Sequence, residues 1–173
     1  QCAAALSRIA AAAENRGAQY LFVLAPGKET IYAEHLPAYA RTPRGALTRA
    51  DQIAPVLQRA GVSMLDLRPA LFEAKASGAP RLYHRTDTHW NGVGAEVGAK
   101  ATLARLGRAS ERRAISAQPA GRGGDLARMI GRDKAVDEEA LGATAPLRAR
   151  CVGEGGAPYE AMALDPLQHR GID

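Results

Sequence analysis

The sequence predicts an α/β fold in which helices flank a mostly parallel sheet. Two apolar runs, residues 18–26 and 62–69, have the length and composition of strands that are buried on both faces. Residues 48–61, which separate them, have apolar positions at helical spacing. A strand, a helix and a second strand in this order favour a right-handed crossover, and hence a parallel sheet.

The chain opens with a predicted helix. Residues 1–17 are rich in alanine, Leu6 and Ile9 recur near helical spacing, and Gly17 follows as the expected stop. A chain that begins inside a helix is expected to be a piece of a longer polypeptide. A shorter helix is predicted over residues 69–78.

Two further helices are predicted from their capping residues. Thr48 is placed to cap the helix between the two strands, with Asp51 three residues later and Gly61 as its end. Asn91 is the expected cap of a helix over residues 91–107. The three glycines in that helix weaken it, which indicates close packing against a neighbour.

The C-terminal part of the sequence has weaker patterns. Residues 108–173 are expected to be rich in loops, with a short helix over 125–131 and a last strand over 147–152. No linker or internal repeat divides the chain. Residues 1–173 are therefore expected to form a single domain, and an incomplete one.

Composition argues against two classes of function. The formal net charge is +5, but the arginines are spread along the chain and aromatic residues make up only 5% of it. Nucleic-acid binding usually requires basic and aromatic residues together, so we do not expect it. No apolar run approaches the roughly 18 residues of a membrane-spanning helix, and the N-terminus lacks the layout of a signal peptide.

Residues 83–95, YHRTDTHWNGVGA, carry the chemistry. Asp87 and His89 are two residues apart, so in an extended segment both side chains project from the same face. This spacing suits an acid that orients an imidazole while the other ring nitrogen accepts a proton from a nucleophile. The same residue types are also common in surface turns, and the spacing alone favours the turn.

A metal site is a third interpretation of this segment. Aspartate and histidine are metal ligands, and His84 and His35 could join Asp87 and His89. Because no third ligand stands at a typical spacing, we expect neither a metal nor another cofactor.

The order of several motifs resembles the alginate O-acetyltransferase AlgJ/AlgX family over about residues 1–130. The most specific motif is TDTHWN, residues 86–91; the pattern P-x-K-x-x-I-Y over 26–32 supports it, and GDL at 124–126 is weaker.

The resemblance implies an SGNH-hydrolase-like fold, flavodoxin-like in outline. It also implies a Ser-His-Asp triad that transfers an acetyl group to an exported polysaccharide, with Asp87 as the orienting acid and His89 as the base. Lys28, Tyr32 and Trp90 become candidates for substrate contact. On general grounds a solvated lysine and half-buried packing rings are the commoner roles of such residues.

The nucleophile of this family is a serine in a G-D-S or G-x-S turn downstream of GDL, and the chain ends without one. None of its serines follows a Gly-Asp pair: Ser7, Ser63, Ser77, Ser110 and Ser116. The two that follow the D-T-H motif lie in an arginine-rich segment without a sharp turn. We therefore expect the serine beyond Asp173, or lost.

The resemblance further implies a periplasmic protein that acts with a polysaccharide acceptor and with an acetyl donor or a membrane acetyl-transfer partner. In an oxidising compartment Cys2 and Cys151 could form a disulfide; composition alone leaves a bridge and two buried thiols equally open. The alternatives to the transferase are a non-catalytic polysaccharide-binding or secretion-complex subunit with the same fold, and a carbohydrate esterase.

Overall fold

The structure is a computed structural model that describes residues 2–43, 45–108, 115–119, 121–143, 150–152 and 158–160. Its elements follow one another in this order: α1 (Cys2–Glu14), β1 (Phe22–Leu24), α2 (Lys28–Ile31), η1 (Ala33–His35), η2 (Ala38–Ala40), α3 (Arg49–Arg59), β2 (Met64–Asp66), α4 (Arg68–Ala76), α5 (Gly92–Arg105), β3 (Ile115–Pro119), α6 (Asp125–Met129), β4 (Glu139–Ala143), β5 (Arg150–Val152) and β6 (Pro158–Glu160).

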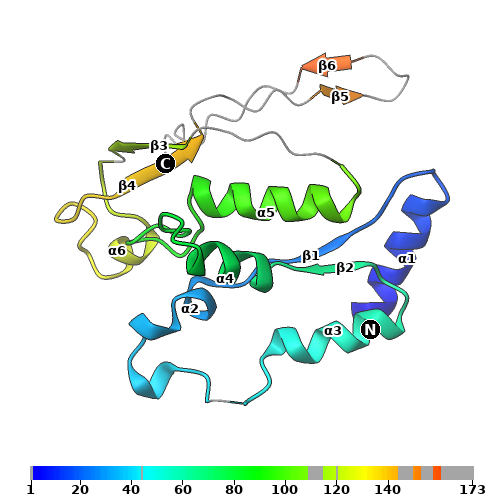
Figure 1. The fold of residues 1–173 in the computed structure, drawn as a ribbon, viewed down its shortest axis with the longest axis horizontal. Coiled ribbons are helices and arrows are strands. Elements are labelled where there is room, and N and C mark those ends of the chain that lie inside the picture. The colour runs from blue at the N-terminus through cyan, green and yellow to red at the C-terminus, as the bar shows by residue number, and fades with distance from the viewer. Residues whose placement is uncertain are drawn as a thin grey trace.

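The predicted strand–helix–strand unit is present, and the α/β class is confirmed. β1 and β2 pair in parallel, with Phe22 opposite Met64 and Leu24 opposite Asp66. Figure 1 shows this pair at the centre of the molecule, with α5 above it and α3 below it. All residues of both strands are half-buried, so the prediction of strands buried on both faces was wrong. A two-stranded sheet consists of edge strands, which two neighbours cannot cover completely.

The predicted helix caps are also present. Thr48 and Asp51 form a reciprocal capping box, in which the Thr48 amide donates to the Asp51 carboxylate at 2.9 Å. Asn91 Oδ1 accepts hydrogen bonds from the amides of Val93 at 2.9 Å and Gly94 at 3.2 Å. These contacts satisfy amides that have no partner within the first turn of a helix.

The glycines of α5 allow the close packing that the sequence predicts. A Cβ atom at Gly94 would lie 2.2 Å from the carbonyl oxygen of Leu82, and one at Gly98 would lie 3.2 Å from the ring of Trp90. The neighbour of α5 is therefore the segment that carries the D-T-H motif. A cluster of buried side chains lies beneath this contact: Ile31, Leu67, Leu71, Leu82, Tyr83 and Val93.

Residues 108–173 contain more regular structure than predicted. β3 pairs antiparallel with β4, and β5 with β6, where the sequence predicts loops and one strand. β3, with the sequence ISAQP, alternates over only five residues and ends in proline, and β4, with the sequence EALGA, lacks the alternation that marks a half-buried strand. Pairing between segments distant in sequence leaves little local signal.

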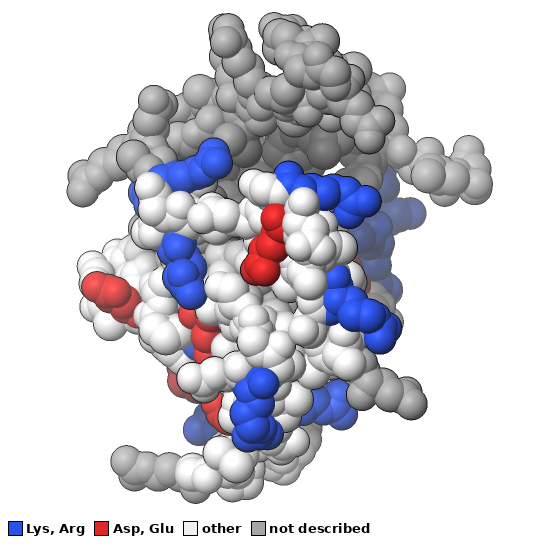
Figure 2. All heavy atoms as spheres, turned by 90° about the vertical axis from the view of Figure 1, so that its right-hand side faces the viewer, with Lys and Arg blue, Asp and Glu red and all other residues white. Residues whose placement is uncertain are grey.

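The described surface and termini add three observations. Figure 2 shows the basic side chains of one face separated by neutral and acidic ones, without a continuous basic patch among the described residues. No helix in the described ranges has the length and apolar character needed to cross a membrane. Cys2 is exposed and forms no disulfide within the described residues, whereas the side chain of Cys151 lies outside them, so the disulfide between the two stays a prediction.

Candidate functional site

The D-T-H motif lies in a loop with fixed ends. Tyr83 and Trp90 form an isolated antiparallel bridge, and the amide of His84 donates to the carbonyl of His89 at 3.1 Å. The amide of Asn91 donates to the carbonyl of Leu82 at 3.0 Å. Residues 84–89 are thereby closed into a loop that begins and ends on the core.

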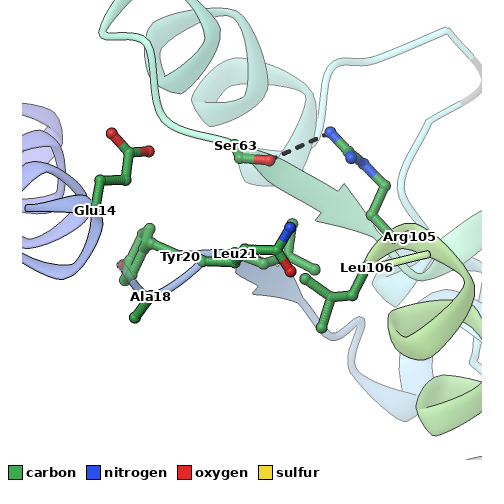
Figure 3. A pocket seen from close by; sticks show the side chains of 8 residues that line it. Glu14, Ala18, Tyr20, Leu21, Ser63, Arg105 and Leu106 are labelled. Carbon is green, nitrogen blue, oxygen red and sulfur yellow. Dashed lines mark hydrogen bonds between the residues drawn. The ribbon is translucent and has the colours of Figure 1, made fainter. Parts of the chain in front are cut away.

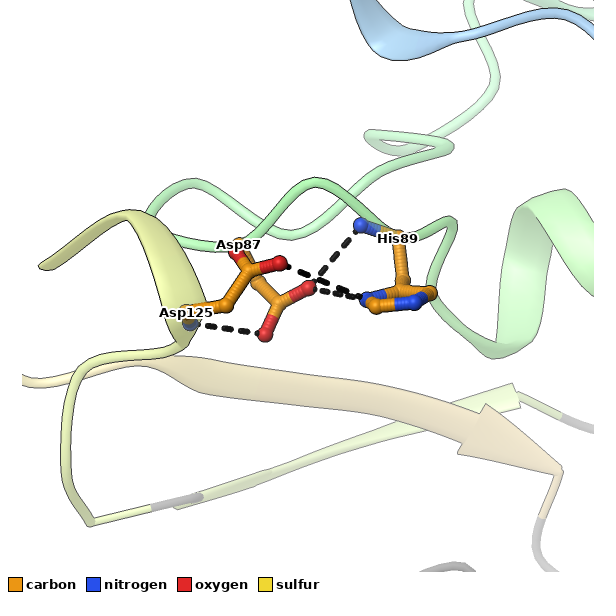
Figure 4. A group of neighbouring side chains, drawn as sticks. All are labelled: Asp87, His89 and Asp125. Atoms are coloured by element: carbon orange, nitrogen blue, oxygen red, sulfur yellow. Dashed lines mark hydrogen bonds and ion pairs between the residues drawn. The ribbon is translucent and has the colours of Figure 1, made fainter. Parts of the chain in front are cut away.

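Asp87 and His89 form the hydrogen-bonded pair that their spacing predicts (Figure 4). Asp87 Oδ1 lies 2.5 Å from His89 Nδ1 and also accepts the His89 amide at 2.9 Å. The Asp87 side chain is 19% exposed and the His89 side chain 75% exposed. The other ring nitrogen, Nε2, lies on the side of this exposed ring that faces away from the two carboxylates. The imidazole is thus held at one nitrogen and open at the other.

The electrostatics of this pair favour an ionised aspartate. Burial raises the pKa of Asp87, but hydrogen bonds from the amides of His89 and Asp125, and from the His89 ring, outweigh burial and lower it to about 2. The hydrogen bond to Asp87 and its negative charge raise the pKa of His89. The pair therefore stabilises a proton on the imidazole.

Acid should weaken the fold through Asp87. Its pKa lies near 2 in the folded protein against an ordinary value of 3.8, so its contribution is complete above about pH 4 and is lost as the pH falls toward 2. The shift corresponds to about 2 kcal/mol of unfolding free energy. Urea unfolding of the wild type and Asp87→Asn at pH 6 and pH 2.5 measures it. If the two proteins lose equal stability between these pH values, the low pKa of Asp87 is contradicted.

His89 contributes to stability in the opposite direction. Because its pKa is raised, the stabilisation is complete below about pH 6.5, its ordinary value, and is lost as the pH rises through the folded-state pKa.

A second carboxylate, Asp125, meets the motif from the start of α6. Its amide donates to Asp87 Oδ2 at 2.9 Å, and its Oδ1 accepts the Thr88 amide at 2.7 Å. Its Oδ2 accepts the Thr88 hydroxyl and lies 3.8 Å from His89 Nδ1. Asp125 was not predicted as a site residue from the sequence, although it belongs to the weak GDL motif.

Three of these side chains could together bind a cation. Ligand atoms of Asp87, His89 and Asp125 all lie within 4.8 Å of one another. His35 and His84, which the sequence offered as additional ligands, lie beside Glu34 and Glu138 instead. A cation bound at His89 Nδ1 would compete with the hydrogen bond to Asp87, because that nitrogen is already engaged.

Glu138 holds the residues just before Asp87, and this role was also not predicted from the sequence. Its side chain is buried, and its two oxygens accept the amides of Arg85 at 2.9 Å and Thr86 at 2.5 Å, together with the Thr86 hydroxyl. Burial raises the pKa of Glu138, but these hydrogen bonds outweigh burial and lower it. An ionised Glu138 therefore fixes the residues just before Asp87.

Lys28 contacts the motif loop directly. Its Nζ donates to the carbonyl oxygens of Arg85 at 2.8 Å and Asp87 at 3.0 Å, and burial lowers its pKa. Since Lys28 follows β1, this contact places the loop beyond the carboxyl end of that strand. Open α/β sheets bind ligands at this edge.

The two aromatic candidates pack against the core. The Tyr32 hydroxyl accepts the Leu82 amide at 3.0 Å, and its ring meets that of Tyr83 edge to face. Trp90 covers Gly98 and is half-buried. These are the packing roles that the sequence offered as alternatives to substrate contact.

No serine with a described side chain is hydrogen-bonded to His89. Ser77 donates to the carbonyl of Glu73, and Ser63 accepts from Arg105 at 3.2 Å in a pocket of about 230 Å³ (Figure 3). That pocket lies at the amino ends of the strands, opposite to the motif loop. Of the other serines, Ser7 lies in α1, and the side chains of Ser110 and Ser116 lie outside the described residues.

Comparison with known proteins identifies similar sequences and similarity to a solved structure. Residues 1–149 match a family described as "SGNH hydrolase-like domain, acetyltransferase AlgX". The chain is 33% identical over 100 residues to a "Probable alginate O-acetylase AlgJ" of Pseudomonas putida, a match that covers 56% of this chain and 24% of that protein. It is 34% identical over 92 residues to the protein of the same name from Pseudomonas syringae pv. tomato, covering 51% and 22%.

Among solved structures, the O-acetyltransferase domain of Pseudomonas putida AlgJ is similar with a TM-score of 0.59 and 24% identity. The match covers 80% of this chain and 54% of that chain, and at this identity it supports the fold alone. The chain thus spans 24% and 22% of the length of the two curated relatives and 54% of the solved domain.

Proposed function

Because this chain belongs to the AlgX family of SGNH hydrolase-like acetyltransferase domains, we propose that it serves O-acetyl transfer to an exported polysaccharide through a Ser-His-Asp triad. The observation that carries the proposal is the state of His89. Asp87 holds its Nδ1, while Nε2 is open to solvent and free to accept a proton.

The reaction has two steps that both use His89. In the first, a serine hydroxyl attacks the carbonyl carbon of an acetyl donor, Nε2 takes the hydroxyl proton, and the donor's alcohol leaves with that proton. In the second, a sugar hydroxyl attacks the acetyl-serine and gives its proton to Nε2, which returns it to the serine oxygen. Asp87 stabilises the imidazolium that forms in each step.

The proposal assigns the nucleophile to a serine outside the described side chains. Within these, Ser63 and Ser77 are engaged elsewhere and no serine contacts His89. The names of the relatives mention alginate, so we assign the acceptor to exported polysaccharides of that kind and the protein to the periplasm. Lys28, Tyr32 and Trp90 stay proposed substrate contacts; Lys28 would act through the motif loop that it holds.

The test is to detect the acetyl-enzyme. We expect the full-length gene product, incubated with 4-nitrophenyl acetate and quenched in acid, to carry an acetyl group on one serine, mapped by peptide mass spectrometry. His89→Ala should not accumulate it. Addition of an alginate oligosaccharide should move the acetyl group to the sugar; release of acetate alone would indicate the esterase. A folded wild-type protein that neither turns over the ester nor becomes acetylated would contradict the proposal and favour the non-catalytic subunit.

A further inference from the structure

We propose that Asp125 and Thr88 together position the His89 imidazole on Asp87, which makes Asp125 a positioning residue for the proposed acetyl transfer. This inference deepens the proposed function and rests on it for its biological meaning. Its physical content, the orientation of one imidazole, can be tested without acetyl transfer.

Thr88 separates the two members of the pair, so its position determines theirs. Both its polar groups donate to one carboxylate: the Thr88 amide donates to Asp125 Oδ1 at 2.7 Å, and its hydroxyl donates to Asp125 Oδ2. The hydroxyl oxygen also lies 3.5 Å from His89 Nδ1. Side-chain–backbone contacts of this kind fix the orientation of a backbone segment. The contacts that Lys28 and Glu138 make with the loop lie before or at Asp87. The amides of Gly124 and Ala127 likewise donate to Thr86, so without the Asp125 carboxylate these contacts would leave Thr88 unheld.

The contact is reciprocal, since α6 also holds Asp87. Asp125 donates its amide to Asp87 Oδ2 at 2.9 Å, while Oδ1 of the same carboxylate faces His89 Nδ1. Oδ2 of Asp87 therefore binds the amide at the start of α6, and Oδ1 binds the imidazole of His89. Close approach is required: a Cβ atom at Gly124 would lie 2.4 Å from the Cβ of Asp87.

Asp125 also adds a second negative charge beside the imidazole. Its Oδ2 lies 3.8 Å from His89 Nδ1, nearer than any described carboxylate except Asp87. Two charged side chains from other elements also hydrogen-bond to the loop: the Lys28 ammonium donates to the Asp87 carbonyl, and the Glu138 carboxylate accepts the amides of Arg85 and Thr86. Glu138 also lies 3.9 Å from His84 Nδ1, and the loop itself carries Arg85. Removing the charge of Asp125 should lower the pKa of His89, because an opposite charge near an imidazole favours its protonated form.

The experiment measures the tautomer and the pKa of His89 by NMR of the imidazole nitrogens in this 173-residue chain. Asp125→Asn removes the charge at constant size, and Thr88→Val removes only the hydroxyl. Asp137→Asn is the matched control, because Asp137 is an exposed aspartate that lies between α6 and β4. Thermal unfolding of each variant checks that the fold is kept.

We expect the neutral His89 of the wild type and of Asp137→Asn to carry its proton on Nδ1. In both Asp125→Asn and Thr88→Val, a larger fraction of neutral His89 should carry its proton on Nε2. Asp125→Asn should also lower the pKa of His89 more than Thr88→Val does. An Asp125→Asn variant that behaves like Asp137→Asn would overturn the proposal. So would a lower pKa with an unchanged tautomer in both variants, since Asp125 would then act only as a charge. Should Asp125→Asn fail to fold, Thr88→Val decides by its tautomer alone.

The same variants separate this inference from the proposed function. In the full-length gene product, a displaced imidazole should lower kcat by roughly tenfold to a hundredfold with little change in KM, because positioning errors act on the reacting geometry. If the NMR result is as expected but no acetyl-enzyme forms in the wild type, the positioning role stands and the acetyl-transfer function fails.

Discussion

Asp87→Asn in the full-length gene product should lower kcat for acetyl transfer by roughly 10⁴-fold while the fold is retained. An asparagine can present its amide group to Nδ1, which would make Nδ1 an acceptor and move the imidazole proton to Nε2. Nε2 could then no longer accept the serine proton. The expected loss is large because the present geometry allows only the productive tautomer, with Oδ1 at 2.5 Å from Nδ1.

The measurement is the rate of acetyl transfer to an oligosaccharide at saturating donor, together with its pH profile. The apparent pKa on the acid side should fall in Asp87→Asn, because the carboxylate that raises the pKa of His89 is gone. Asp137→Asn, an exposed aspartate outside the motif, serves as the control and should behave as the wild type. Retention of more than about a tenth of the activity in Asp87→Asn would remove Asp87 from the triad.

The Asp87–His89 contact could be predicted from the sequence because its cause is local. Residues 85–89 form bends in place of the extended segment that the prediction assumed, yet Asp87 Oδ1 still reaches both the amide and the ring of a residue only two positions away. The same holds for the Thr48–Asp51 capping box and the Asn91 cap, whose partners lie within three residues. In each case the interacting groups are close in sequence, so residue types and spacing were sufficient.

The residues that support the Asp87–His89 pair from other segments could not be predicted, because their contacts join parts of the chain that are distant in sequence. Asp125 lies 37 residues from Thr88, and Glu138 lies 52 residues from Thr86. Asp125 begins the predicted short helix over 125–131, and Glu138 stands in a segment expected to be a loop; in both settings acidic residues are usually solvated. Only the fold brings them to the motif. The low pKa of Asp87 depends in part on the hydrogen bond from the Asp125 amide, so it could not be predicted from the sequence either.

The second glycine of the TDTHWNGVG sequence offers the strongest test of how the fold supports the loop: Gly94→Ala should destabilise the protein by about 3 kcal/mol. Its Cβ would lie 2.2 Å from the Leu82 carbonyl oxygen and 2.9 Å from the Trp90 Cβ. The Leu82 carbonyl cannot move away freely, because it accepts the Asn91 amide at 3.0 Å. Relief of the clash must therefore break the closure of the motif loop or move α5.

Gly98→Ala is the matched control for this prediction, one turn further along α5. Its Cβ would meet only side chains, the Trp90 ring at 3.2 Å and Leu67 at 3.3 Å, which can move by a few tenths of an ångström. The gain in helix propensity, about 1 kcal/mol, should offset most of that cost. Urea unfolding of the two variants measures the difference as a lower midpoint at an unchanged slope for Gly94→Ala. Equal midpoints would show that α5 and residues 82–90 are not packed as closely as described, and the fixed position of Asp87 and His89 would then lose its structural basis.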